Sequence, residues 1–172
     1  MNLLVLLKMV PDVVEELEIA SDGAGLDMDV ARMALSESDD HALEQALLLK
    51  ERLGGKVTVL ALDAPEVDDA LFTALAKGAD RAMKVEATGV PRTGTRATTD
   101  LLARVIADGH DLLPADLILT GTQAIDDLDG LMAPLVAHLL GLPYIAIVIQ
   151  VTPDAAGKVA SVVKEYAGGV RG

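Results

Sequence analysis

The apolar and polar residues of this chain are arranged so that short buried strands alternate with amphipathic helices. Short apolar runs that end in polar or glycine-containing segments are typical of strands buried on both faces of a parallel sheet. We interpret four runs in this way: residues 2–7, 56–62, 81–86 and 117–119. Helical spacing of apolar residues predicts a helix from the N-cap candidates at 36–40 to the glycines at 54–55, and further helices at 66–77, 96–108 and 131–140.

The stretch 115–143 shows this organisation most completely. The apolar run Leu117–Leu119 is followed by a loop rich in Asp and Gly, then by a helix that ends at Gly141 before Pro143. In open α/β sheets, ligands bind at the carboxyl ends of strands, where a helix N-terminus offers free N–H groups to an anion. We therefore expect the loop 121–130 to form a ligand site.

The remaining segments extend this parallel arrangement. Residues 16–20 and 26–30 alternate around a glycine-containing turn, which predicts a β-hairpin inserted after the first strand. Residues 87–95 are expected to form a loop. The apolar run 144–151 is interpreted as a strand, with Ile145–Ile149 in the core, and it is expected to pair with 158–166. Together these features predict an α/β fold with a three-layer, doubly wound, mostly parallel sheet in a single domain, 1–172.

Composition narrows the possible partners and compartments. The chain carries 27 acidic and 14 basic residues, a formal net charge of −13, which argues against nucleic acid and anionic membrane surfaces as partners. It has no cysteine, and no apolar run reaches membrane-spanning length. The apolar segment 1–10 contains Lys8 and meets Pro11, so we interpret it as a strand and not as a signal peptide. A cytoplasmic protein without membrane insertion is expected.

Residues that could support bond chemistry are sparse. His41, His110 and His138 lie in separate segments without ligand spacing, and the sequence contains no G-x-S-x-G, P-loop or G-x-G-x-x-G motif. Asp126, Asp127 and Asp129 could bind a cation, but turn formation and helix capping are the simpler interpretation. We therefore predict no catalytic residue and no metal ligand, and expect a module that binds an adenine nucleotide or flavin.

Five segments, in order along the chain, resemble the β subunit of electron transfer flavoproteins of the bacterial type. They are LLVLLKMVPD at 3–12, DDHALEQALLLKE at 39–51, TALAKGADRAMKVE at 73–86, GTQAIDD at 121–127 and KEYAGGV at 164–170. The resemblance implies an electron transfer flavoprotein-type Rossmann-like fold, related to that of the adenine nucleotide alpha hydrolases. It also implies an electron carrier subunit and not an enzyme. In its first segments, the chain is similar to nitrogen-fixation-linked and bifurcating members of this family.

The resemblance implies a heterodimer with an α subunit that serves flavin dehydrogenases and a downstream acceptor. FAD would be shared with the α subunit, and the β domain would bind AMP or a second FAD. The residues that the resemblance assigns to cofactor binding are Leu6, Lys8, Ser36, Asp63, Gln123, Ala124, Asp126, Asp127, Asp129, Gly130, Leu131 and Met132.

Several of these positions depart from the family pattern. The segment 128–132 reads Leu-Asp-Gly-Leu-Met where the family has small and polar residues that hold a phosphate. Ser36-Glu37 replaces Asn-Pro, Asp63 replaces a glycine that lets the backbone approach the nucleotide, and Val13 replaces an aromatic residue. The clustered carboxylates would repel a phosphate unless a cation intervenes. The resemblance therefore implies an altered nucleotide pocket.

The C-terminal segment is a further departure, because the family continues after the Gly168-Gly169 turn through another strand and an arm that embraces the α subunit. A truncated or divergent member is expected. Two alternatives to the electron carrier stay open: a redox-inactive scaffold of the same family, and an adenine-nucleotide binder of the universal stress type. The second alternative lacks the glycine-rich phosphate loop of its group.

Overall fold

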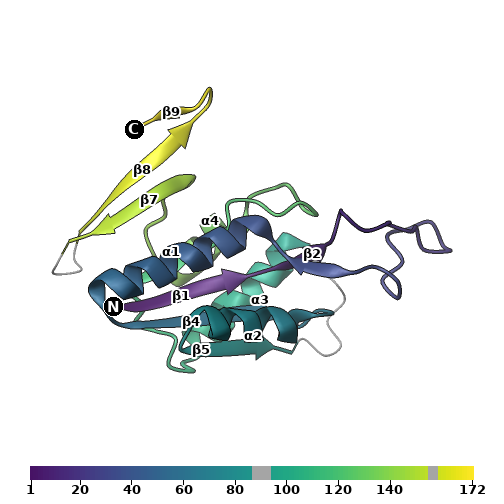
Figure 1. The fold of residues 1–172 in the computed structure, drawn as a ribbon, viewed down its shortest axis with the longest axis horizontal. Coiled ribbons are helices and arrows are strands. Elements are labelled where there is room, and N and C mark those ends of the chain that lie inside the picture. The colour runs from purple at the N-terminus through teal and green to yellow at the C-terminus, as the bar shows by residue number, and fades with distance from the viewer. Residues whose placement is uncertain (87–93, 155–158) are drawn as a thin grey trace.

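A four-stranded parallel sheet forms the centre of the molecule (Figure 1). The computed structural model describes residues 1–86, 94–154 and 159–172. Its strands lie in the order β5-β4-β1-β6, with bounds Arg81–Val85, Lys56–Leu62, Asn2–Leu7 and Leu117–Leu119. β1 pairs in parallel with β4 on one side and with β6 on the other. The chain therefore reverses its direction of winding at β1, and the carboxyl ends of β1 and β6 flank the switch point.

Four helices cover the two faces of this sheet. The helices α1 (Glu37–Leu53) and α2 (Val67–Lys77) pack on the face formed by Leu3, Val5 and Leu7. The helices α3 (Thr95–Ala107) and α4 (Met132–Leu140) pack on the opposite face, against Leu4 and Leu6. Successive strand residues point to opposite faces, and both faces are covered, which is why β1 is apolar at every position from Leu3 to Leu7. The predicted α/β fold with a parallel central sheet is confirmed.

The helix boundaries follow local signals in the sequence. Ser36 precedes α1, three carboxylates lie in its first turn, and Gly54 follows it with a φ of 71°. Gly78 follows α2 with a φ of 124°, and Gly141 follows α4 with a φ of 66°, so both adopt conformations that glycine accepts without strain. The loop predicted at 87–95 lies mostly outside the described residues.

The insertion after β1 is only partly regular. A short antiparallel pair, β2 (Met9–Pro11) with β3 (Met33–Leu35), lies at its base. Between these strands, Ile19 and Leu26 form one isolated antiparallel bridge. The two strands predicted at 16–20 and 26–30 are not confirmed. Ile19 is 73% exposed, so an alternating pattern here has little core to pack against.

The C-terminal part forms a separate antiparallel sheet beside the central one (Figure 1). It contains β7 (Val148–Pro153), β8 (Ala160–Tyr166) and β9 (Val170–Arg171). The predicted pairing of the two longer strands is confirmed, although position 158 lies outside the described residues. The predicted strand start at 144 and the core placement of Ile145–Ile149 are wrong. β7 begins after Ile147, which has a φ of 53°, and Ile145 and Ile147 are more than half exposed.

Candidate functional site

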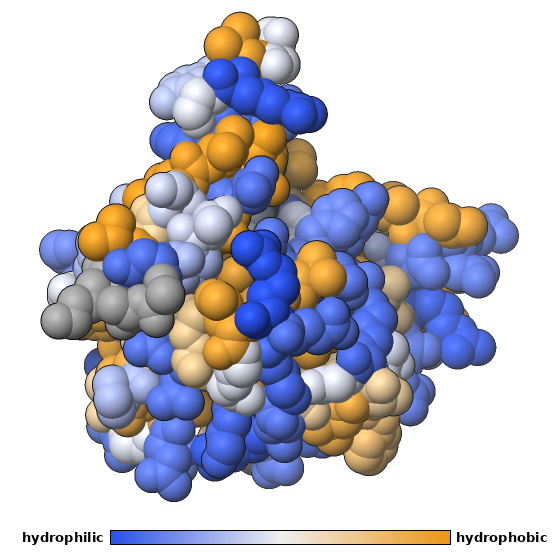
Figure 2. All heavy atoms as spheres, turned by 60° about the vertical axis from the view of Figure 1, so that its left-hand side comes forward, coloured by the Kyte–Doolittle hydropathy of each residue, from blue (hydrophilic) through white to orange (hydrophobic). Residues whose placement is uncertain are grey.

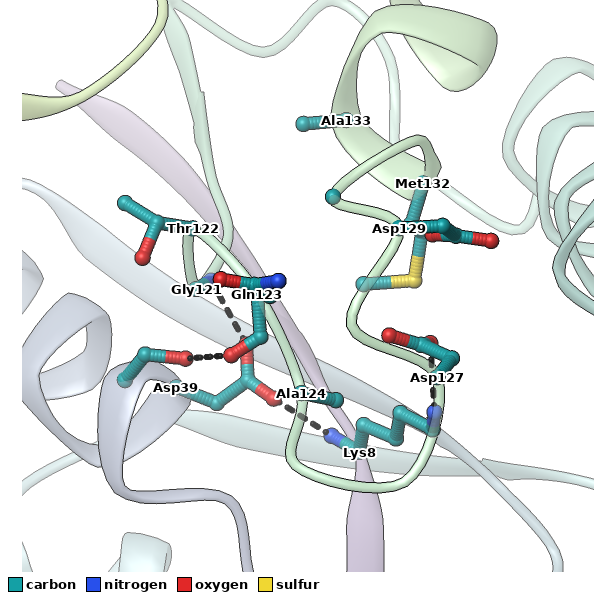
Figure 3. A pocket seen from close by; sticks show the side chains of 12 residues that line it. Lys8, Asp39, Gly121, Thr122, Gln123, Ala124, Asp127, Asp129, Met132 and Ala133 are labelled. Carbon is teal, nitrogen blue, oxygen red and sulfur yellow. Dashed lines mark hydrogen bonds and ion pairs between the residues drawn. The ribbon is translucent and has the colours of Figure 1, made fainter.

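The ends of β1 and β6 enclose a small polar cavity at the switch point of the sheet (Figure 3). Lys8 follows β1 directly, the loop 121–130 follows β6, and the first turn of α1 lies against both. The cavity has a volume of about 20 Å³, which is room for a water molecule but not for a nucleobase. This is the edge at which open α/β sheets bind ligands.

Asp39 joins the two strand ends. Its carboxylate accepts the backbone N–H of Lys8 at 3.1 Å and that of Gly121 at 2.6 Å, and the residue is only 2% exposed. Burial raises the pKa of Asp39 to about 6, even though the two N–H bonds act in the opposite direction. One side chain from α1 therefore fixes the spacing between β1 and β6.

Gly121 lies so close to α1 that no side chain fits. A Cβ at this position would lie 2.5 Å from an Asp39 carboxylate oxygen and 2.9 Å from the Asp39 backbone nitrogen. Next to it, the Ser38 hydroxyl donates to the Gln123 carbonyl at 3.0 Å. The start of α1 is thus closed by the loop that follows β6.

Lys8 is the cation of the site, and two carboxylates already bind it. Its ammonium lies 2.5 Å from Asp126 Oδ1 and 2.7 Å from Asp127 Oδ2. Burial alone would lower the pKa of Lys8, but the hydrogen bonds and charges of the two carboxylates outweigh it, so the pKa is raised. Lys8 therefore stays charged and neutralised within the chain.

The start of α4 is also bound by a carboxylate of the loop. Asp129 accepts the backbone N–H of Leu131 at 2.9 Å and the Thr95 hydroxyl at 2.6 Å. The hydrogen bond from Thr95, then that from Leu131, holds the pKa of Asp129 below its usual range. The Gln123 amide donates to the Leu128 carbonyl, and Leu128 takes a left-handed φ of 54° that closes the loop. The loop thus places its own carboxylate directly before α4.

The structure brings most of the predicted site residues together and separates four of them. Seven line the cavity, and Asp126 lies beside it on Lys8: the seven are Lys8, Gln123, Ala124, Asp127, Asp129, Gly130 and Met132. Ser36 is buried behind the cavity, where its hydroxyl lies 3.2 Å from that of Ser38 and hydrogen-bonds the Asp39 carboxyl. Leu131 instead lines an open groove of about 810 Å³ between α3 and α4.

Two further predictions do not fit the cavity. Leu6 points to the face covered by α3 and α4, because it alternates with Leu7 along β1. Asp63 follows β4, where its exposed carboxylate lies 3.7 Å from Lys84. Neither residue lines the cavity.

Sequence reasoning missed the residue that organises the site. In the sequence, Asp39 is one of several adjacent polar residues at 36–40, and this pattern predicts only an N-cap for the helix. Its position three residues after Ser36 was the available signal, because a carboxylate there lies in the first helical turn and can face the neighbouring strand ends. Gly121 and Ser38 also contribute to the cavity wall.

Comparison with known proteins establishes the family of this chain. The family model described as "Electron transfer flavoprotein domain" matches residues 26–170, which includes the cavity loop and most of the C-terminal sheet. The chain belongs to the electron transfer flavoprotein family. The predicted resemblance is therefore confirmed.

Individual relatives carry names from the same family. The chain is 35% identical over 154 residues to a protein named electron transfer flavoprotein subunit beta from Clostridium acetobutylicum, covering 90% of this chain and 58% of that protein. It is 33% identical to the protein of that name from Thermoanaerobacterium thermosaccharolyticum, covering 88% and 56%. It is 37% identical to Protein FixA of Bradyrhizobium diazoefficiens, covering 77% and 47%. The chain spans about half the length of these relatives.

The cavity does not fit the nucleotide phosphate that membership of the electron transfer flavoprotein family suggests. Its lysine is bound by two carboxylates, and an N–H at the start of α4 is bound by a third. Leu131 and Met132 carry no hydrogen-bonding side chain at the positions that follow. Among the described residues, no group of acidic, histidine or cysteine side chains is arranged to hold a metal ion. In the same part of the chain, no helix is long and apolar enough to cross a membrane.

Proposed function

We propose that this chain is a β-type subunit of an electron transfer flavoprotein, which pairs with an α-type subunit and carries electrons between flavin dehydrogenases and a downstream acceptor. The match of the family model to residues 26–170 is the observation that carries this proposal. The names of the relatives at 33–37% identity support it. The subunit would act as an electron carrier and not as an enzyme of bond chemistry.

The finer assignments follow from this proposal. FAD would be held jointly with the α-type subunit, in the cytoplasm, and residues 1–172 would form one domain of the electron transfer flavoprotein type. The parallel sheet with helices on both faces supports a fold related to that of the adenine nucleotide alpha hydrolases. By the family pattern, a second nucleotide, AMP or another FAD, would be expected at the ends of β1 and β6, but the carboxylates of this chain do not fit its phosphate there.

Exposed apolar side chains on the C-terminal sheet support pairing with another subunit. Figure 2 shows hydrophobic residues on the C-terminal sheet, which projects at the top of the view, and at the base of this sheet. The exposed apolar residues of this region are Tyr144, Ile145, Ile147, Ile149, Val159, Tyr166 and Val170. Apolar surface of this kind marks protein interfaces, because burying it against a partner removes it from water. We place the α-type subunit on this sheet.

Co-expression with the neighbouring α-type subunit tests the proposal. The pair is expected to co-purify with the visible absorbance of bound flavin, whereas the chain alone should be colourless. The double variant Ile149→Thr/Val170→Thr keeps β-branched side chains and is expected to weaken co-purification. The matched control is Val14→Thr/Ile19→Thr, which changes exposed apolar residues of the insertion. Equal loss in both variants, or a pair that forms without flavin, would overturn the assignment.

The second candidate function is a redox-inactive scaffold of the same family. The cavity favours it, because its lysine is already neutralised by two carboxylates. The two functions differ in one measurable property. The scaffold would co-purify with its partner but without flavin, and the electron carrier would bring flavin into the pair.

A further inference from the structure

We propose that the cavity at the ends of β1 and β6 excludes nucleotide phosphate, because the carboxylates of the following loop occupy the groups that would bind it. Asp126, Asp127 and Asp129 are the residues that we infer to determine this specificity. The inference rests on the proposed function, since that function makes an adenine nucleotide the expected ligand. It predicts a β-type subunit without a nucleotide of its own.

The first occupied group is the ammonium of Lys8. A phosphate at the switch point needs a cation or free N–H donors, and Lys8 is the cation that lines this cavity. Asp126 and Asp127 contact its ammonium at 2.5 and 2.7 Å. An entering phosphate would have to displace both carboxylates and then remain beside them.

The second occupied group is at the start of α4. A helix N-terminus attracts anions through its free N–H groups. Here Asp129 already takes the Leu131 N–H at 2.9 Å, and its other oxygen is held by Thr95 of α3 at 2.6 Å. The Asp129 carboxylate therefore lies directly before the first turn of α4, held in place by Thr95 of a second helix, and its negative charge opposes an anion that approaches this helix N-terminus.

The remaining side chains offer no compensation. The side chains of Leu128 and Leu131 carry no hydrogen-bonding group, and neither residue lines the cavity. Asp39 adds a fourth carboxyl group within the cavity wall, where it binds the N–H groups of Lys8 and Gly121. Two of the four carboxyl groups contact the Lys8 ammonium and the other two bind neighbouring N–H and O–H groups, so the charge of the cavity opposes a phosphate.

Titration of the purified chain with AMP, followed by calorimetry, tests the inference. Wild type, alone and in the pair with the α-type subunit, is expected to show no binding at concentrations where a nucleotide-loaded subunit would be saturated. The triple variant Asp126→Asn/Asp127→Asn/Asp129→Ser removes the three charges and keeps a hydroxyl at position 129 that can accept the Leu131 N–H. It is expected to bind AMP at least about tenfold more tightly than wild type. Adding Lys8→Met should abolish that gain.

A charge-matched control separates the effect of the cavity carboxylates from the effect of the net charge of the chain. The variant Asp69→Asn/Asp108→Asn/Glu44→Gln removes three exposed carboxylates remote from the cavity and should leave AMP binding unchanged. Tight AMP binding by wild type would overturn the inference without any variant. A folded triple variant that gains nothing, or that gains no more than the control, would also overturn it. These AMP-binding results do not depend on pairing with the α-type subunit. The co-purification experiment tests the proposed function separately.

Discussion

The buried carboxyl group of Asp39 leads us to predict how the free energy of unfolding depends on pH. Its carboxyl group holds the N–H groups of Lys8 and Gly121 and is almost fully buried. Replacing it by asparagine keeps the shape of the side chain. However, the amide nitrogen of Asn cannot accept an N–H bond, so one of the two backbone donors loses its partner. A buried donor without a partner costs about 1–3 kcal/mol.

Because the pKa of Asp39 is raised on folding, the free-energy difference between wild type and Asp39→Asn depends on pH and decreases as pH rises. Burial raises the pKa of Asp39 from 3.8 to about 6 on folding. A carboxyl group with a raised folded pKa stabilises the fold fully below its unfolded pKa, and this stabilisation is lost as pH rises through the folded pKa. Between about pH 5 and about pH 7.5, the wild type should lose about 1.4 kcal/mol from this group. Asp39→Asn has no such titration.

Urea unfolding followed by circular dichroism measures the effect. The free energy of unfolding of Asp39→Asn is expected to be below that of wild type at about pH 5, and the difference should narrow by about 1.4 kcal/mol at about pH 7.5. Glu37→Gln, at an exposed position in the same first turn of α1, shows whether any nearby carboxylate gives the same profile. A difference that stays constant or widens with rising pH would refute the reasoning.

Three further substitutions test the packing around the site and the stability of the fold. Gly121→Ala should destabilise the chain strongly, because its Cβ would meet the Asp39 carboxylate at 2.5 Å; unchanged thermal stability would contradict this. Leu60→Ala should cost about 2–5 kcal/mol of unfolding free energy, because Leu60 is fully buried, while Leu48→Ala on the exposed side of α1 should cost far less in the same urea assay. Asp80 accepts the Val57 N–H at 2.8 Å and pairs with Lys50, and the hydrogen bond from Lys50 lowers its pKa. Its stabilisation should therefore be present above about pH 3.8, disappear as pH falls through the lower folded pKa, and be absent in Asp80→Asn over an acid titration.

The sequence predicted the central sheet well, because a strand that is buried on both faces has apolar residues at consecutive positions. β1 is apolar at five consecutive positions, Leu3 to Leu7, and only a strand covered on both faces needs this. Glycines at the helix ends marked where α1 and α2 end. These signals are local, so they can be interpreted without knowing the rest of the structure.

The C-terminal sheet was predicted less well because apolar residues do not reveal what they face. Ile145, Ile147 and Ile149 are as apolar as the residues of β1, yet each is more than a third exposed. A residue that packs on its own core and one that faces a partner have the same side chain. The left-handed backbone of Ile147 adds a break that apolar periodicity cannot predict.

The candidate site was predicted in outline but not in its connections. The motif at 121–127 located the loop, but Asp39 comes from a distant helix, and its contact with Gly121 depends on tertiary packing. Likewise, the sequence placed Asp126, Asp127 and Asp129 together without showing that two of them bind Lys8 and the third binds the Leu131 N–H just before α4. Pairing between segments far apart in the chain is what the sequence alone does not specify.

The nucleotide content of the purified pair is the most direct test of the proposed function. The chain would be co-expressed with the neighbouring α-type subunit, the pair denatured, and the released nucleotides separated by chromatography after a visible spectrum is recorded. FAD from the pair, with none from the chain alone, is the result that we predict for a β-type electron carrier. A stable pair that releases no flavin would contradict this assignment and leave the scaffold in its place.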